Sequence, residues 1–208
     1  MLKVDQIKLT LDSYPLHYNL CVAKGEIVAL QGPSGVGKTT LLNIIAGFIQ
    51  PESGSIQWDE SPIQHLPAEL RPVSMLFQDH NLFEHISVWD NLLLGFNQQA
   101  PTDKLLSAAQ ALGIEDQLNK KPGTLSGGQR QRVALIRTML RDEPIILLDE
   151  PFAELDPSTR EAAGHWTRST AKSLNKTVLL VTHQEEDVVR VADRMIAFCY
   201  PSLEATES

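Results

Sequence analysis

The sequence predicts an α/β fold with a core of buried parallel strands, an N-terminal antiparallel β part and an inserted helical subdomain. Three runs of four apolar residues, at 27–30, 145–148 and 178–181, are short enough for strands buried on both faces of a sheet. Helical or turn-like segments separate these runs, which is typical of α/β proteins. From residue 79 to about residue 143 the apolar residues follow helical spacing instead, and this stretch predicts the insertion.

The first third of the chain supplies most of the expected strands. Residues 2–11 and 16–22 alternate between polar and apolar side chains, which predicts the antiparallel part. A glycine-rich loop follows the first buried run, and residues 38–48 then predict a compact helix. Residues 51–59 predict a turn and a short strand, and residues 73–77 predict one more buried strand.

We expect these elements to form a single domain. Residues 1–78 and 144–208 would be its α/β core, and residues 79–143 its helical subdomain. Prolines at 101, 122 and 144 punctuate the helical part.

Composition and charge exclude several classes of partner. The net charge of −8 argues against nucleic acid as the main partner, because phosphate contacts require a basic face. The longest uninterrupted apolar run, at 195–200, is far short of the roughly 20 residues that cross a bilayer, and the N-terminus does not resemble a signal peptide. We therefore expect the chain to stay in the cytosol. The apolar neighbours of Cys21 and Cys199 predict reduced, buried thiols.

A phosphate-binding loop lies between the first buried strand and the helix at 38–48. The sequence GPSGVGKT at 32–39 fits the pattern G-x-x-x-x-G-K-[ST]. In such a loop the backbone N–H groups surround the α- and β-phosphates, Lys38 reaches the β/γ oxygens, and Thr39 offers a hydroxyl to Mg²⁺. The predicted nucleotide-binding residues here are Gly32, Pro33, Ser34, Gly35, Val36, Gly37, Lys38, Thr39 and Thr40.

Two carboxylates, Asp149 and Glu150, follow the buried run at 145–148. A strand end places them at the carboxyl edge of the sheet, beside the phosphate loop. There Asp149 would hold Mg²⁺ through water, and Glu150 would orient or deprotonate the attacking water.

The segment LSGGQRQRVALIRTML at 125–140 predicts an amphipathic helix with two glycines in its first turn. Ser126 and Gln129 form a helix-capping box, which explains both residues structurally. The box does not explain Gly127 and Gly128, since each glycine costs a helix about 0.5–1 kcal/mol relative to alanine. Glycines at a helix N-terminus leave room for an anion, so they suggest a second phosphate site, although the chain has only one phosphate loop.

LSGGQ at 125–129, together with GPSGVGKT and IILLDE, resembles the signature of the ATP-binding cassette ATPases over nearly the whole chain. The resemblance implies a P-loop (RecA-like) ATPase core with a helical signature subdomain, and ATP and Mg²⁺ as ligands. It also implies a head-to-tail homodimer. In that arrangement Ser126, Gly127, Gly128 and Gln129 of one chain would close on the γ-phosphate held by the loop of the other.

Further residues take roles from the same resemblance. Gln78 resembles the Q-loop glutamine that senses Mg²⁺ and water, and His183 resembles the switch histidine that contacts the γ-phosphate. Asp156 resembles the D-loop aspartate, but the family usually has serine and alanine where Ala153 and Glu154 stand.

The family usually stacks adenine on an aromatic residue upstream of the phosphate loop. Tyr14 is the candidate here, although its spacing to the loop is short, whereas Tyr18 alternates with apolar residues and is expected in the core.

Residues 71–95 resemble the corresponding part of importer ATPases, closest to those of thiamine uptake systems. This implies an ATP-hydrolysing subunit at the cytoplasmic face of the inner membrane that works with integral-membrane permease subunits and a periplasmic or extracellular substrate-binding protein. Leu82, Phe83, Ile86 and Trp89 would either receive a helix of the permease or pack within the helical subdomain.

Two functions other than import share part of this pattern. A regulatory GTPase needs an N-K-x-D motif, but the sequence NKKP at 119–122 has Pro122 in place of the aspartate. A soluble cassette ATPase of non-transport type, such as an iron–sulfur assembly factor, shares the chemistry and stays open at this point.

Overall fold

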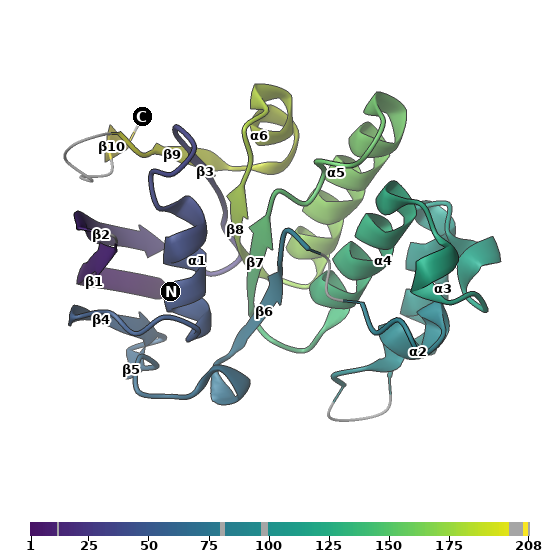
Figure 1. Ribbon diagram of the computed structural model, residues 1–208, viewed down its shortest axis with the longest axis horizontal. Helices are drawn as coiled ribbons and strands as arrows, with labels where there is room; N and C mark the ends of the chain where they lie inside the picture. The colour runs from purple at the N-terminus through teal and green to yellow at the C-terminus, as the bar shows by residue number, and fades with distance from the viewer. Residues whose placement is uncertain (12, 80–81, 97–99, 200–205, 208) are drawn as a thin grey trace.

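The computed structural model describes residues 1–207 except 12, 80–81, 97–99 and 200–205. These residues form two β-sheets and several layers of helices (Figure 1). The predicted α/β fold, with its antiparallel part and helical insertion, is confirmed.

An antiparallel sheet occupies the N-terminal side of the fold, with the strand order β2-β1-β4-β5. Its strands are β1 (Leu2–Leu11), β2 (Tyr14–Val22), β4 (Ser53–Trp58) and β5 (Ser61–Pro62). In β2 the side chains of Leu16, Tyr18, Leu20 and Val22 are buried and those between them are more exposed. This period of two is the alternation that predicted the strand.

The second sheet carries the α/β core and has the order β10-β9-β3-β8-β7-β6. Its strands are β3 (Ile27–Gln31), β6 (Val73–Leu76), β7 (Ile145–Asp149), β8 (Thr177–Val181), β9 (Arg194–Ala197) and β10 (Thr206–Glu207). All neighbouring strands run parallel except β9 and β10. The carboxyl ends of β6, β7 and β8 therefore meet at one edge of the sheet.

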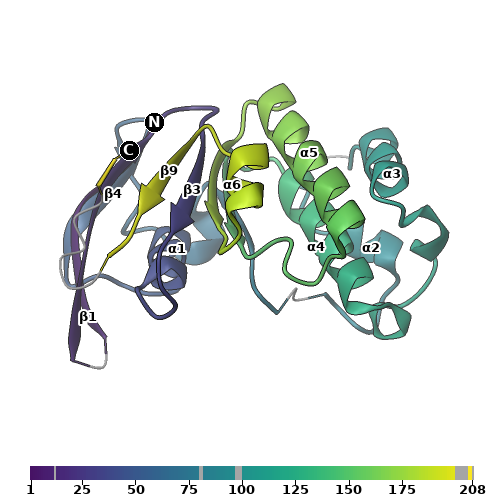
Figure 2. The same cartoon turned by 90° about the horizontal axis from the view of Figure 1, so that it is seen from above.

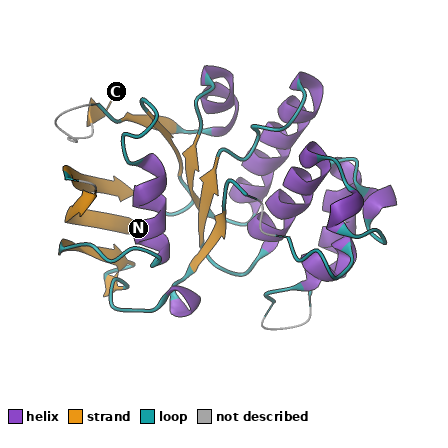
Figure 3. Cartoon of the chain, viewed as in Figure 1, coloured by secondary structure: helices purple, strands orange, loops and turns teal. Residues whose placement is uncertain are grey.

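Helices cover both faces of the parallel sheet, as Figures 2 and 3 show. Helix α1 (Lys38–Ala46) lies between the two sheets. On the other face lie α4 (Gly127–Leu140), α5 (Pro157–Ser173) and α6 (Glu185–Val191). Beyond α4 are α2 (Val88–Leu93) and α3 (Thr102–Ala111). Short 3₁₀ turns are η1 (Ala68–Leu70), η2 (Glu115–Gln117) and η3 (Pro122–Thr124).

Two hydrophobic cores follow from this layering. Alternate residues of β7 point to opposite faces of the sheet, so Leu147 packs with α1 and the antiparallel sheet. Leu148 packs with α4 in a second core that continues into α2 and α3. Helices α1 and α4 are thus separated by the sheet. Among the described residues, every helix is too short or too polar to cross a membrane.

The predicted burial of the cysteines is wrong. Cys21 and Cys199 are both free thiols, as expected, but both are exposed. In β2 the position of Cys21 faces outward, because the buried residues on either side of it, Leu20 and Val22, point to the other face.

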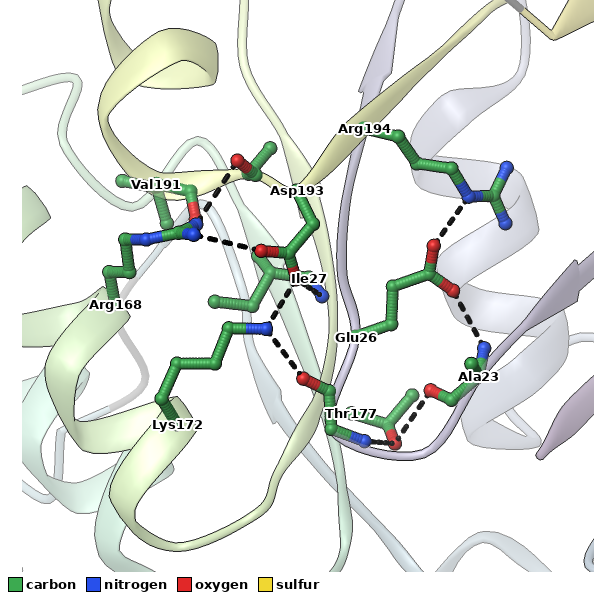
Figure 4. Close-up of polar contacts among 11 residues, drawn as sticks. Ala23, Glu26, Ile27, Arg168, Lys172, Thr177, Val191, Asp193 and Arg194 are labelled. Carbon is green, nitrogen blue, oxygen red and sulfur yellow. Dashed lines mark hydrogen bonds and ion pairs between the residues drawn. The ribbon is translucent and has the colours of Figure 1, made fainter.

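Asp193, just before β9, joins helix α5 to the start of β3 (Figure 4). Its carboxylate accepts hydrogen bonds from the backbone N–H of Ile27 at 2.9 Å, from Arg168 at 2.9 Å and from Lys172. Burial by itself raises the pKa of Asp193, but these hydrogen bonds outweigh it and hold the pKa below its ordinary value. The charged form of Asp193 therefore stabilises the fold.

We expect Asp193→Asn to lower the free energy of unfolding by about 2 kcal/mol at pH 7, the contribution of hydrogen bonds to a charged group. Because the folded pKa is depressed, the stabilisation is present above the unfolded value of about 3.9 and is lost as the pH falls through the lower folded value. Urea titrations at pH 7 and near pH 3 measure this difference. Asp116→Asn, at an exposed position, is the matched control. An equal loss of stability at both pH values would contradict the assignment.

Candidate functional site

The phosphate loop joins β3 to α1 and presents the bare N-terminus of the helix. Gly37, the residue before α1, has a φ of 98° in the left-handed region, and among the described residues no side chain caps the helix there. The first turn of α1 also contains no acidic residue. Its N–H groups and its partial positive charge are therefore available to an anion.

Lys38 is held inside this loop. Its Nζ donates hydrogen bonds to the carbonyl oxygens of Gly32 at 2.8 Å and of Pro33 at 2.9 Å, and only 5% of the residue is exposed. Burial lowers the pKa of Lys38, while the charges of Glu150 and Asp149 act to raise it. The loop carbonyls thus surround the ammonium group of Lys38, which interacts electrostatically with the carboxylates of Glu150 and Asp149.

Tyr18 contacts the end of the phosphate loop. Its hydroxyl donates a hydrogen bond to the carbonyl of Gly37 at 2.8 Å. A Cβ at Gly37 would lie 2.5 Å from this hydroxyl, so the close approach requires glycine. Tyr18 is 1% exposed, and burial raises its pKa above the ordinary value. Its predicted place in the core is confirmed.

Asp149 and Thr39, two of the three residues predicted to hold a metal ion, lie together, and Gln78 is the third. Asp149 ends β7 and is 3% exposed. Burial raises the pKa of Asp149, and a hydrogen bond from the Thr39 hydroxyl acts in the opposite direction. The pair joins the start of α1 to the carboxyl edge of the sheet.

Glu150 and His183, predicted as catalytic residues, are in contact. Oε1 of Glu150 lies 3.1 Å from Nε2 of His183, which follows β8. The backbone of Glu150 has a φ of 49°, and its N–H donates to the carbonyl of Val181 at 3.0 Å. A left-handed conformation is unfavourable for a residue with a Cβ, so the surrounding contacts hold the carboxylate in place.

Gln78 lies at the margin of this cluster, whereas Tyr14 lies in the antiparallel sheet. Gln78 is exposed in the turn after β6, at the same sheet edge as Asp149, because Leu76 pairs with Leu148 in parallel register. Tyr14 begins β2 opposite Leu11 and is 67% exposed. The Tyr14 ring is thus accessible to a ligand.

The signature glycines lie at the start of α4, against a segment of their own chain. The predicted capping box is present, since Ser126 accepts from the N–H of Gln129 at 3.3 Å and Gln129 accepts from the N–H of Ser126 at 2.9 Å. A Cβ at Gly127 would lie 1.8 Å from Oε2 of Glu154, and one at Gly128 would lie 2.9 Å from the Glu154 carbonyl oxygen. This contact is one reason for the two glycines, and it involves Glu154, a position where the resemblance leads us to expect alanine.

Gln131 belongs to no predicted motif, but it contacts the segment 150–154, which carries Glu150. Its Nε2 donates to the carbonyl of Glu150 at 2.9 Å, and its Oε1 accepts from the N–H of Glu154 at 2.8 Å. One signal was available: Gln131 shares a helical stripe with Leu135 and Thr138, at i+4 and i+7, and all three are buried.

Residues 16–153 match the family described as ABC transporter. The thiamine import ATP-binding protein ThiQ of Escherichia coli (strain K12) is 44% identical over 201 residues, which cover 94% of this chain and 87% of that protein. ThiQ of Shigella sonnei (strain Ss046) gives the same identity and coverage.

Two solved structures of the cassette MJ0796 have a similar fold. The dimeric structure of this bacterial ABC transporter cassette is 28% identical with a TM-score of 0.82, over 95% of this chain and 94% of that one. A dimeric post-hydrolysis state of the same cassette, bound to ADP and Pi, is 28% identical with a TM-score of 0.85, over 100% and 98% of the two chains. On this evidence the chain belongs to the ABC transporter family and is an ATP-binding cassette ATPase.

Proposed function

We propose that the chain energises the import of thiamine through separate membrane subunits by hydrolysing ATP. The observation that carries the proposal is the cluster of Lys38, Asp149, Glu150 and His183 around the phosphate loop. The curated relatives are named for thiamine import, which favours transport over the non-transport alternatives.

The residues of the cluster have distinct tasks in hydrolysis. The phosphates of ATP bind backbone N–H groups of the phosphate loop, and Lys38 neutralises charge on the β- and γ-phosphates. Glu150 accepts a hydrogen bond from the attacking water and takes its proton, while His183 contacts the γ-phosphate beside it. Tyr14 stacks on the adenine.

Mg²⁺ fits the donors at this site. The Thr39 hydroxyl and the Asp149 carboxylate are hard oxygen ligands that already lie within hydrogen-bond reach of each other. Thr39 would hold the ion directly and Asp149 through water, with Gln78 at the same edge of the sheet. The ion would neutralise charge on the phosphate oxygens.

A head-to-tail homodimer would complete each ATP site. The phosphate loop lies at the N-terminus of α1, on one face of the parallel sheet. The signature lies at the N-terminus of α4, on the other face. Ser126, Gly127, Gly128 and Gln129 would therefore meet an ATP bound to the partner subunit. The MJ0796 structures are dimeric, which supports a homodimer.

A groove beside β6 would receive a helix of the membrane subunit. Its cavity has a volume of about 310 Å³. It is lined by residues of the α/β core, including Phe48, and of the helical subdomain, including Phe83 and Leu94. These three side chains are 56%, 50% and 39% exposed, which leaves apolar surface open at the groove. Leu82 and Trp89 pack against the core of the helical subdomain, which is the second of the two alternatives open for them.

The subunit would lie at the cytoplasmic face of the inner membrane through this contact, with a substrate-binding protein on the opposite side. The test is co-purification from detergent-solubilised membranes together with uptake of labelled thiamine. Recovery of a specific integral-membrane partner and ATP-dependent uptake of thiamine support the proposal. A purely soluble complex would refute it, and uptake of another solute would refute the substrate.

We expect Phe83→Ser to lower thiamine uptake about tenfold, the effect of losing about 1.4 kcal/mol of binding. The ATPase of the isolated subunit should change less than twofold, since Phe83 is half exposed and outside the ATP site. Leu106→Ser, which removes an apolar side chain of α3 that is 43% exposed, is the control and should leave uptake unchanged. Equal losses of uptake and ATPase would show that Phe83 serves packing alone.

A further inference from the structure

Gln131, on α4, forms hydrogen bonds with both ends of the segment 150–154, which carries Glu150. The segment begins at Glu150, whose carbonyl accepts from Gln131, and reaches Glu154, whose N–H donates to it. Gln131 itself is 3% exposed. Its amide orientation is determined by its partners, because a carbonyl can only accept and a backbone N–H can only donate.

The conformation of Glu150 needs such support. With a φ of 49° it lies in the left-handed region, and its N–H is held by the carbonyl of Val181 on β8. Its carbonyl accepts from Gln131 at 2.9 Å and from the N–H of Ala153 at 3.2 Å. Gln131 thus ties this backbone to α4, in addition to the contact that Val181 provides from β8.

The same helix begins with the signature. Gln131 lies one turn after Gly127 and Gly128, which approach Glu154 closely enough that side chains there would collide with it. A displacement of the start of α4 would therefore move the Gln131 amide together with the glycines, because a helix moves as a rigid element. The amide would transmit that displacement to the backbone of Glu150.

We propose that Gln131 is a positioning residue that links the signature helix to the orientation of Glu150. This inference rests on the proposed role of Glu150 as the base. It assigns to Gln131 an effect on the rate of the hydrolytic step and none on the binding of ATP.

The first test is Gln131→Met in the full chain. Methionine has a similar volume and removes both hydrogen bonds, so we expect kcat to fall at least tenfold with the ATP affinity unchanged within twofold. Thr167→Val on α5 is the matched control, since it removes a buried hydroxyl that donates to Ala163 at 2.7 Å and lies outside the site. Circular dichroism checks that each variant is folded. A loss of kcat no greater than in the control would overturn the proposal.

The second test separates positioning from general damage. Gln131→Glu places a carboxylate oxygen against the Glu150 carbonyl at pH 8, but burial raises the pKa of the new carboxyl group, and its protonated form can donate. The activity of this variant relative to wild type should therefore rise at least threefold from pH 8 to pH 6. A ratio that does not change with pH would contradict a role that depends on donation to Glu150.

The third test shows whether Gln131 acts through Glu150. In a Glu150→Gln background, single-turnover hydrolysis should change less than twofold when Gln131→Met is added, because the base is already absent. A further tenfold loss would refute the link. If Glu150→Gln alone retains the wild-type rate, the proposed function is refuted. If Glu150→Gln lowers the rate but Gln131→Met does not, only the proposed role of Gln131 is refuted.

Discussion

Glu150→Gln is expected to lower ATP turnover by about 100-fold or more while ATP binding is retained. General base catalysis contributes about 10²–10⁴-fold, and an amide can orient a water molecule but is a poor acceptor of its proton. Glutamine has the same shape, so the contact with Nε2 of His183, at 3.1 Å from the carboxylate, can persist. Steady-state phosphate release and ATP titration measure the two quantities separately.

The same substitution should favour the closed dimer. It removes one negative charge from a site that binds the phosphates of ATP, so repulsion between protein and nucleotide decreases. Size-exclusion chromatography with ATP should show more dimer than for wild type. Glu161→Gln, at an exposed position of α5, is the control for loss of a carboxylate. Hydrolysis at the wild-type rate in Glu150→Gln would mean that the base has been misassigned.

The phosphate loop and its acids could be predicted because the signals are local. Glycine spacing marks the loop, a short apolar run marks each buried strand, and parallel strands bring their carboxyl ends to one edge. Lys38, Thr39 and Asp149 therefore come together although the acid is distant in sequence. The left-handed backbone of Glu150 has no such local signal, since no glycine marks it.

The contacts of Gln131 and Glu154 could not be predicted in this way. A helical stripe shows that Gln131 is buried, but its partners depend on how α4 packs against the segment after β7. The close approach of Glu154 to Gly127 is a tertiary contact of the same kind. Cys21 shows the opposite case. The alternation of β2 predicts that Cys21 faces away from Leu20 and Val22, so the apolar character of these neighbours is no sign that Cys21 is buried.

A mixed dimer of two inactive variants is expected to bind one ATP tightly, although the homodimer of each variant binds none tightly. One chain carries Lys38→Ala, which removes the charge that pairs with the β/γ-phosphates and should abolish tight binding at its own loop. The other carries Gly127→Asp, whose carboxylate would repel the γ-phosphate at the signature. If the sites are composite, the intact loop of the second chain faces the intact signature of the first.

Gly127 is a better position for this test than Gly128. A Cβ at Gly128 would lie 2.9 Å from the carbonyl oxygen of Glu154, so a side chain there would displace backbone near Glu150. A Cβ at Gly127 would meet the carboxylate end of the Glu154 side chain, which can turn away. Gly127→Asn has the same shape as Gly127→Asp without the charge, and so separates repulsion from crowding.

The two arrangements of the ATP site give opposite results for the mixture. With composite sites, the mixed dimer contains one intact site and one site that carries both substitutions. Each parental dimer contains no intact site. With sites formed within each chain, mixing restores nothing. Turnover can require both sites, so trapped nucleotide should be counted alongside phosphate release, with differently tagged chains purified in sequence. One tightly held ATP per mixed dimer, absent from both parents, would establish the composite site. No recovery in proven mixed dimers would leave the contact with Glu154 as the only reason that the structure gives for the two glycines.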